Sequence, residues 1–302
     1  MADIELRHLR YLLAVAEHGS FTRAAEVLFV SQPTLSHQIK QLEHALGVQL
    51  LDRNGRIVRL TAIGVAYVEP VRRALRDIAA AERALHDVQD LSRGHLRLGV
   101  TPTFTAYLVG PLAASFHTRH PGICLTVTEM TQDRIEAALL ADELDVGIAF
   151  AGGHAPGIAA AALFTETLSL VTSRLHAENL PDPLPVQVLS TEHLALLSAD
   201  FATRKHIDAF LIEHDVDPRI VLEANSIQAL SEIVQRTSLA TVLPEAVTHD
   251  HPHLAPVPLD PPIPSRSVAL LHRENGYRSA AVLAFTRVVY HLIESQGYKP
   301  AR

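Results

Sequence analysis

The chain has 302 residues, of which 48% are hydrophobic, and a formal net charge of −7. This length accommodates two or three domains with buried cores. No stretch approaches the roughly 18 apolar residues of a membrane span, and the acidic, polar N-terminus does not follow the pattern of a signal peptide. Cys124 is the sole cysteine, which excludes an internal disulfide and a multi-cysteine metal site. We therefore expect a cytoplasmic protein without a membrane partner.

The charge is distributed unevenly along the chain. Residues 1–60 carry seven basic and six acidic side chains, whereas residues 94–302 carry a net charge of −8. An acidic body disfavours nucleic-acid binding over the whole surface. It is compatible with a small DNA-binding domain, the head, that is basic only locally. Taken alone, the charge favours a small-molecule-binding protein.

Three short helices are predicted near the N-terminus, over 4–17, 21–28 and from Gln32 to Leu46, because apolar residues recur there at helical spacing. Gly19 is placed to end the first helix, and Ser20 and Ser31 to cap the second and third. Pro33 falls in the first turn of the third helix, where proline is tolerated. Two helices joined by a tight turn over about 21–40 indicate a helix-turn-helix that suits the DNA major groove.

The outward face of the third helix is polar, and such side chains can bond base edges or phosphates. Residues 50–60 predict a hairpin with an Asn54–Gly55 turn, whose arginines would form a basic wing over the DNA backbone. A solvated helix beside a charged loop is the alternative, but caps, turn, helix and wing occur together in order. The candidate DNA-binding residues are Thr22, Arg23, Gln32, Pro33, Thr34, Ser36, His37, Lys40, Arg53, Arg56 and Arg59.

This stretch resembles the winged helix-turn-helix of LysR-type transcriptional regulators, whose pattern includes GSFTRAA, SQPTLSHQI, QLE, LG and L-DR. The resemblance extends over the whole chain. It implies a regulator that binds double-stranded DNA at an inverted repeat, acts as a homodimer or homotetramer, contacts RNA polymerase and is not an enzyme. His37 stands where arginine is common in the family, which bears on the base that is read there.

A long helix is predicted over 62–91, with Thr61 placed to cap it and Pro70 able to kink it. Its apolar residues advance by threes and fours and form one stripe, which needs a partner. The partner could be the chain's own C-terminal domain, but the family resemblance implies pairing of two subunits. The stripe comprises Ile63, Tyr67, Val71, Ala74, Ile78, Ala81, Leu85 and Val88.

The C-terminal body alternates strands with helices, which predicts parallel sheets and an α/β fold. Ser92–Gly94 marks a break, so we divide the chain into a DNA-binding domain (1–61), a linker helix (62–91) and an effector domain (92–302). The strand at 267–273 and the helix at 279–295 are expected to return to the first lobe. Lobe 1 is then about 92–163 and 267–302, and lobe 2 about 164–266. Two lobes around a cleft match the periplasmic-binding-protein-like architecture of LysR-type effector domains.

Ligands of open α/β sheets bind beyond the carboxyl ends of the strands, and free N–H groups at helix N-termini suit anions. Each hydroxyl there could instead be an ordinary helix cap. Arg204 could add positive charge or lie exposed. The candidate effector-binding residues are Thr101, Pro102, Thr103, Phe104, Thr131, Phe150, Ser198, Phe201, Thr203 and Asn225.

Several motifs of the body, TPTFT, GPL, DELDVGIAF, LLSADFATR and EANSI, resemble the members of the family that control cyanate breakdown. This resemblance implies that cyanate, a small linear anion, is the inducer, and that the protein activates a cyanate-degradation operon and represses its own gene. Another small carboxylate or an aromatic acid is the alternative inducer. A small-molecule-binding protein without a regulatory role is the alternative function.

Two features are expected to carry no chemistry, and no cofactor is predicted. His249, His251 and His253 lie close together, but Pro252 interrupts them and no helix-spaced pair occurs, so we expect a loop and not a metal site. Cys124 lies in an apolar strand and is expected to be a core thiol. No phosphate loop or nucleophile elbow is present.

Overall fold

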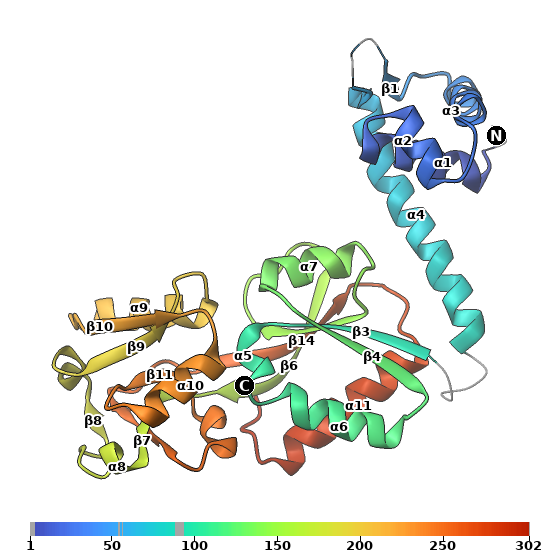
Figure 1. Cartoon of the computed structure of the whole chain (residues 1–302). Helices are drawn as coiled ribbons and strands as arrows, with labels where there is room; N and C mark the ends of the chain where they lie inside the picture. Colours follow the sequence, from blue (N-terminus) through green and yellow to red (C-terminus); the bar gives the residue numbers. More distant parts are fainter. Residues whose placement is uncertain (1–3, 54, 56, 88–93, 302) are drawn as a thin grey trace. The chain divides into compact units, whose positions relative to one another are not determined.

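The computed structural model describes residues 4–53, 55, 57–87 and 94–301, and the chain divides into two compact units, residues 1–86 and 87–302. Figure 1 shows the first unit as a small helical head with one long helix, and the second as an α/β body. Among the described residues, no helix combines the length and the hydrophobicity needed to cross a membrane.

The head is built from three helices whose ends agree with the predicted caps. Gly19 and Gly47 adopt left-handed conformations with φ of 60° and 69°, as helix C-caps do. The Ser20 and Ser31 hydroxyls accept hydrogen bonds from backbone N–H groups in the following turns. The helices are α1 (Leu6–His18), α2 (Phe21–Val27) and α3 (Gln32–Leu46).

The wing is shorter than the predicted hairpin. Strand β1 (Leu51–Asp52) pairs in antiparallel fashion with β2 (Arg59–Leu60). The predicted turn is only partly described, because Asn54 and Arg56 lie outside the described residues.

Helix α4 (Ala62–Asp87) begins in close contact with the wing. The Thr61 hydroxyl accepts a hydrogen bond from the Gly64 N–H at 3.0 Å and donates one to the Gln49 carbonyl at 2.8 Å. A Cβ at Gly64 would lie 2.1 Å from the Leu50 carbonyl oxygen, so only glycine allows this approach. The start of α4 is therefore fixed to the head.

The predicted apolar stripe of α4 is not one continuous buried face. Of its members, Val71 is buried and Tyr67 and Ile78 are partly buried, whereas Ile63 is 53% exposed. Ala74 and Ala81 are also exposed. Val88 and the predicted break at 92–93 lie outside the described residues. Tyr67 thus packs against the core of the head, whereas Ile63, Ala74 and Ala81 are exposed among the stripe residues whose side chains are described.

Lobe 1 contains a five-stranded sheet in the order β4-β3-β5-β14-β6. Strands β3, β4 and β5 are parallel as predicted, and the α/β class is confirmed, but β14 runs antiparallel to both β5 and β6, so the sheet is mixed and not parallel throughout. Strand β14 follows all of lobe 2 in the sequence. The chain can therefore return to the sheet from the other end, and β14 runs opposite to its neighbours β5 and β6. The strands are β3 (Gly94–Val100), β4 (Ile123–Glu129), β5 (Val146–Phe150), β6 (Ile158–Glu166) and β14 (Arg266–Arg273).

Helices cover both faces of this sheet (Figure 1). Helices α6 (Val109–Arg119) and α11 (Ala280–Ser295) pack together on one face, where Phe116 and Phe285 meet edge to face at 5.3 Å. Helix α7 (Gln132–Leu140) covers the other face. The expected return of 267–273 and 279–295 to the first lobe is confirmed by β14 and α11.

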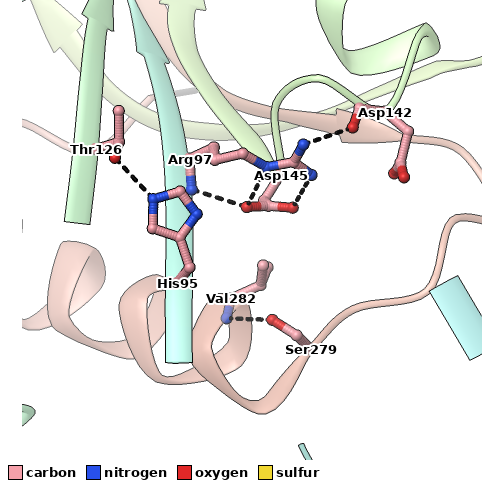
Figure 2. Close-up of polar contacts among 7 residues, drawn as sticks. All are labelled: His95, Arg97, Thr126, Asp142, Asp145, Ser279 and Val282. Carbon is pink, nitrogen blue, oxygen red and sulfur yellow. Dashed lines mark hydrogen bonds and ion pairs between the residues drawn. The ribbon is translucent and has the colours of Figure 1, made fainter. Parts of the chain in front are cut away.

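An ion pair ties the middle of β3 to the residue just before β5 (Figure 2). The Arg97 Nη2 and Nε atoms donate to the two Asp145 carboxylate oxygens at 2.7 and 3.2 Å, and Nη1 donates to the Asp142 carbonyl at 2.7 Å. The hydrogen bond to the Asp145 carboxylate raises the pKa of the Arg97 guanidinium above its ordinary value. Figure 2 also shows Ser279 capping α11 through the Val282 N–H.

Lobe 2 is built from three small sheets. Its strand orders are β11-β7-β12, which is antiparallel, and the parallel pairs β10-β9 and β13-β8. The strands are β7 (Leu168–Ser173), β8 (Leu184–Pro185), β9 (His193–Leu197), β10 (Arg219–Ala224), β11 (Thr241–Pro244), β12 (Leu254–Val257) and β13 (Leu259–Asp260). The helices are α8 (Arg174–Ala177), α9 (Ala202–Glu213) and α10 (Ile227–Arg236), with short 3₁₀ turns at Val186–Ser190 and Glu245–Asp250.

Cys124 is exposed, so the prediction of a core thiol was wrong. It lies on β4, the edge strand of the sheet, and most residues of this strand after Ile123 are exposed. The apolar sequence of β4 resembles that of a core strand. The spacing of apolar residues does not reveal which strand of a sheet is outermost, so the exposure of Cys124 could not be predicted from it.

Candidate nucleic-acid interface and ligand cleft

The polar residues at the start of α3 form one accessible face. Gln32, Pro33, Thr34, His37 and Lys40 are exposed, and Leu35 and Ile39 between them are fully buried. The amphipathic pattern therefore turns the small polar side chains away from the core, where DNA can reach them. Ser36 is partly buried. In α2, Thr22 and Arg23 are exposed at the first turn.

Two of these side chains have local partners. The Thr34 hydroxyl lies 2.7 Å from the Ser31 hydroxyl, and His37 Nε2 lies 3.1 Å from Gln41 Nε2. Both contacts lie on the exposed face of the helix.

The three wing arginines differ in their surroundings. Arg53 donates to Glu43 Oε2 at 2.6 Å and lies over the Phe21 ring, 5.4 Å from its centroid. Glu43 also accepts the Leu50 and Leu51 N–H groups. Arg53 therefore holds the wing against α2 and α3, besides any contact to DNA. Arg59 is exposed, and Arg56 lies outside the described residues.

A cavity of about 580 Å³ lies between the lobes of the second unit. It is lined from lobe 1 by the ends of β3, β4 and β5, and from lobe 2 by the segment that begins α9 and by Asn225 after β10. These are carboxyl ends of strands, as the topology rule requires. Seven of the ten predicted effector-binding residues line the cavity: Thr101, Pro102, Thr103, Thr131, Phe150, Phe201 and Asn225.

A second cavity of about 280 Å³ shares part of this wall. Pro102, Glu129, Phe201 and Asn225 line both cavities, and Ser226 with the first turn of α10 lines only the second. The cleft is thus a larger chamber with a smaller one beside it.

Hydroxyl groups in the cleft differ in whether they have partners. Thr101 is 4% exposed, lines the larger chamber, and its Oγ1 has no hydrogen-bond partner among the described residues. A buried polar atom without a partner is costly, so a ligand that bonds it gains affinity.

Arg266 lies behind the cleft wall and joins several groups. Its guanidinium lies over the Phe150 ring, 3.9 Å from the centroid, and its Nη2 donates to the Thr203 hydroxyl at 3.1 Å and to Glu166. The Tyr107 hydroxyl donates to the other Glu166 oxygen at 2.7 Å. Burial raises the pKa of Glu166, against the attraction of Arg266.

Three predicted residues do not line the cavity. Phe104 is fully buried in the core, where its ring lies 5.0 Å from that of Phe150. Thr203 is fully buried behind the wall, and Ser198 donates to Asp200 at 2.7 Å. Arg204, which could have been exposed, is 8% exposed and bonds Asp208 and Glu223.

Met130, Asp200 and Ala202 also line the wall, and they lie in segments beyond strand ends that the topology rule indicates. Five further wall residues were not predicted from the sequence, although they lie at the end of β4 or in the first turns of α7 and α9. They are charged or polar: Glu129, Gln132, Asp133, Arg134 and Lys205. Arg134 and Lys205 supply the two basic groups of the wall against three carboxylates.

The part of the chain that the structure describes contains no group of three or more His, Cys, Asp or Glu side chains placed to hold a metal ion. His249, His251 and His253 extend from the short 3₁₀ turn at Glu245–Asp250 into the loop that follows.

Comparison with known families identifies both parts of the chain. Residues 6–65 match the bacterial regulatory helix-turn-helix protein family, LysR type, and residues 89–292 match the LysR substrate binding domain. A protein named "Probable RuBisCO transcriptional regulator" from Trieres chinensis is 35% identical, covering 76% of this chain and 77% of its own. The DNA-binding transcriptional dual regulator OxyR of Escherichia coli (strain K12) is 30% identical, covering 89% and 90%. Neither name mentions cyanate.

The same two-part organisation occurs in a solved structure. Full-length CbnR in complex with its target DNA matches 95% of this chain and 99% of its own, with 25% identity and a TM-score of 0.55. The helix-turn-helix, the wing and the two-lobed domain with its cleft all agree with the family matches. The chain therefore belongs to the LysR family of DNA-binding transcriptional regulators.

Proposed function

We propose that this regulator is switched by a small anion bound in the larger chamber of the cleft. The observation that carries the proposal is the unpartnered Thr101 hydroxyl in a wall that also holds Thr131 and the first turn of α7. Free N–H groups at a helix N-terminus stabilise an anion, and Arg134 and Lys205 add positive charge. Ligand binding would favour one arrangement of the lobes over another.

Cyanate is the first candidate ligand. The motifs around Thr101, Asp145, Ser198 and Asn225 support it through their resemblance to regulators of cyanate breakdown. In that case the protein activates a cyanate-degradation operon and represses its own gene. One relative is named as a dual regulator, which is consistent with a protein that activates one gene and represses another.

A larger carboxylate or an aromatic acid is the second candidate, and the size of the cleft favours it. A chamber of about 580 Å³ falls in the range that holds ligands of many atoms, whereas cyanate has three. Met130, Phe150 and Phe201 provide apolar wall for a ring or chain. Arg134 and Lys205 would then bind the carboxylate of the ligand.

On DNA, two or four copies would act together. The head has seven basic and six acidic side chains in residues 1–60, so a single head would bind weakly. Exposed apolar residues on α4, such as Ile63 and Val65, suit pairing with a second copy. Paired heads would bind an inverted repeat, with affinity raised by their linkage, and RNA polymerase would be the next partner on the promoter.

Thermal shift and calorimetry with cyanate, azide, bicarbonate and benzoate test the ligand. Thr101→Val should abolish the response to the true ligand without loss of stability, because the hydroxyl has no partner in the fold. Thr241→Val is the matched control, since Thr241 Oγ1 is also buried and unpartnered, and its residue does not line the cleft. A response to benzoate but not to cyanate would replace the first candidate with the second.

A binding protein without a regulatory role would behave differently on DNA. Gel-shift titration with the DNA upstream of the gene distinguishes the two functions. Binding to this DNA well above binding to random DNA supports the regulator. Equal, salt-sensitive binding to both would contradict it.

A further inference from the structure

The chain crosses between the two lobes next to Glu166 and Arg266. Glu166 is the last residue of β6, and β7 in lobe 2 begins at Leu168. Arg266 is the first residue of β14, where the chain has returned from lobe 2. The two residues face each other in the antiparallel ladder of β6 and β14, and their side chains form an ion pair. This ion pair therefore joins the outgoing and the returning connection between the lobes.

The ion pair is buried and held from a second side. The side chains of Glu166 and Arg266 are 2% and 10% exposed. The Tyr107 hydroxyl donates to one Glu166 carboxylate oxygen at 2.7 Å, and the Arg266 Nη2 donates to the other. Hydrogen bonds to charged partners in a buried network fix the positions of the groups that make them. Glu166 thus anchors the Arg266 guanidinium at the crossing point.

The anchored guanidinium contacts both the wall of the ligand chamber and lobe 2. It lies over the Phe150 ring, 3.9 Å from the centroid, and Phe150 lines the larger chamber. Its Nη2 also donates to the Thr203 hydroxyl at 3.1 Å, and Thr203 lies in the first turn of α9. Because Arg266 stands behind the wall, it acts on a ligand only through the residues that it holds.

One donor of Arg266 is not used. Its Nε atom is buried and has no hydrogen-bond partner among the described residues. A buried donor without a partner costs free energy, which lowers the cost of moving the guanidinium to an arrangement in which Nε is bonded. The bond to the neutral Thr203 hydroxyl is weaker than the charged bond to Glu166. A movement of lobe 2 would therefore break the bond to Thr203 first.

We propose that Arg266 is the positioning residue of the ligand chamber. From the crossing point it holds Phe150 of lobe 1 and Thr203 of lobe 2 in the relative positions that ligand binding requires. A ligand that shifts α9 changes the contact with Arg266, and the change reaches both connections between the lobes through β6 and β14. The inference rests on the proposed binding of a ligand in the chamber and adds the residue that links the chamber to the arrangement of the lobes.

Hydrogen–deuterium exchange of full-length Arg266→Lys without ligand tests this role. Lysine keeps the charge that pairs with Glu166 but lacks the planar group that lies over Phe150 and reaches Thr203. We expect exchange to become about tenfold faster in the first turn of α9 and at the end of β5, and to stay unchanged in β3. Arg97→Lys is the matched control, because Arg97 pairs with Asp145 inside lobe 1. It should leave exchange in α9 unchanged.

Calorimetry with benzoate and cyanate adds the ligand to the test. Arg266→Lys should weaken binding of whichever anion the original protein binds by about tenfold, and Arg97→Lys should leave its affinity unchanged. A second variant combines Glu166→Gln with Arg266→Met, which removes both buried charges and keeps an acceptor for the Tyr107 hydroxyl. Replacement of a whole buried pair preserves the fold better than loss of one partner. This double variant should show the same two effects.

The other outcomes overturn the inference. Faster exchange throughout both lobes would show that Arg266 only stabilises the fold. Unchanged exchange in α9, or unchanged affinity for the bound anion, would show that Arg266 does not position the chamber. If the original protein binds neither anion, the proposed function fails with these probes, whereas the exchange experiment without ligand still decides the role of Arg266.

Discussion

The Thr103 hydroxyl of helix α5 (Pro102–Thr105) lies 3.0 Å from the Thr203 hydroxyl of α9, and this bond joins the two lobes beside the cleft. Both side chains are buried. Because Thr203 accepts a hydrogen bond from Arg266, its own hydrogen is available for Thr103. A ligand that bonds Thr103 would compete with this contact, and the pair would then couple ligand binding to the arrangement of the lobes.

Thr203→Val should therefore weaken the contact between the lobes and destabilise the fold. Valine leaves the Arg266 donor and the Thr103 hydroxyl without their partner, at a cost of about 1–3 kcal/mol in the free energy of unfolding. Urea denaturation measures this cost. Thr172→Val is the control, since Thr172 is equally buried but has only a 3.4 Å bond to the Leu239 carbonyl. Equal losses in both variants would contradict a special role of the inter-lobe bond.

His37→Ala and Lys40→Ala should separate base recognition from phosphate binding. Lys40 is exposed on α3, and removal of one phosphate contact should weaken binding to all DNA and reduce the salt slope by about 1. His37→Ala should weaken binding to the upstream DNA more than to random DNA. Gel shifts at several salt concentrations provide both quantities. Parallel losses on both DNAs for His37→Ala would remove it from the base-reading set.

Glu43→Ala should loosen the wing. The carboxylate accepts the Leu50 and Leu51 N–H groups at 2.9 and 3.0 Å and the Arg53 guanidinium at 2.6 Å. Loss of a partly buried acceptor with three donors should cost about 2–3 kcal/mol. Thermal unfolding of the full chain reports it. Glu69→Ala, which removes an exposed pair with Arg72, should change stability by less than about 0.5 kcal/mol.

Tyr298→Phe should change stability only at alkaline pH. Burial, together with the nearby Asp250 and Glu166 carboxylates, raises the pKa of Tyr298 to about 12 from its ordinary value of 10.0. A raised pKa in the folded state means that stability is retained below pH 10 and lost as the pH rises towards about 12. The variant should lose less stability over this window in denaturation at pH 9, 10 and 11. Tyr290→Phe, at a side chain 40% exposed on α11, is the control, and an identical alkaline loss in all three proteins would refute the assignment.

The head could be predicted closely because its signals are local. Ser20, Ser31, Gly19 and Gly47 cap helices within a few residues, and buried Leu35 and Ile39 keep the period of a helix. Capping and periodicity act over one or two turns, so neighbouring residues contain the information.

The body was predicted less completely because its decisive contacts are distant in sequence. Glu166 and Arg266 are 100 residues apart, as are Thr103 and Thr203, and no short pattern announces either pair. Strand β6 was not predicted, since its run of alanines at 159–162 has no strand period. The direction of β14 and the exposure of Cys124 depend on strand order, which periodicity does not contain.

The close approach at Gly64 has a mechanical consequence. The Leu50 carbonyl lies against the first turn of α4, and Thr61 bonds Gln49 on one side of the junction and Gly64 on the other, so the start of α4 is fixed to the segment that follows α3. If α3 binds in the major groove, as the sequence predicts, its angle on the DNA would follow the axis of α4. In a pair of copies, rotation of one α4 about its axis would therefore rotate the α3 of the same copy on the DNA by the same angle.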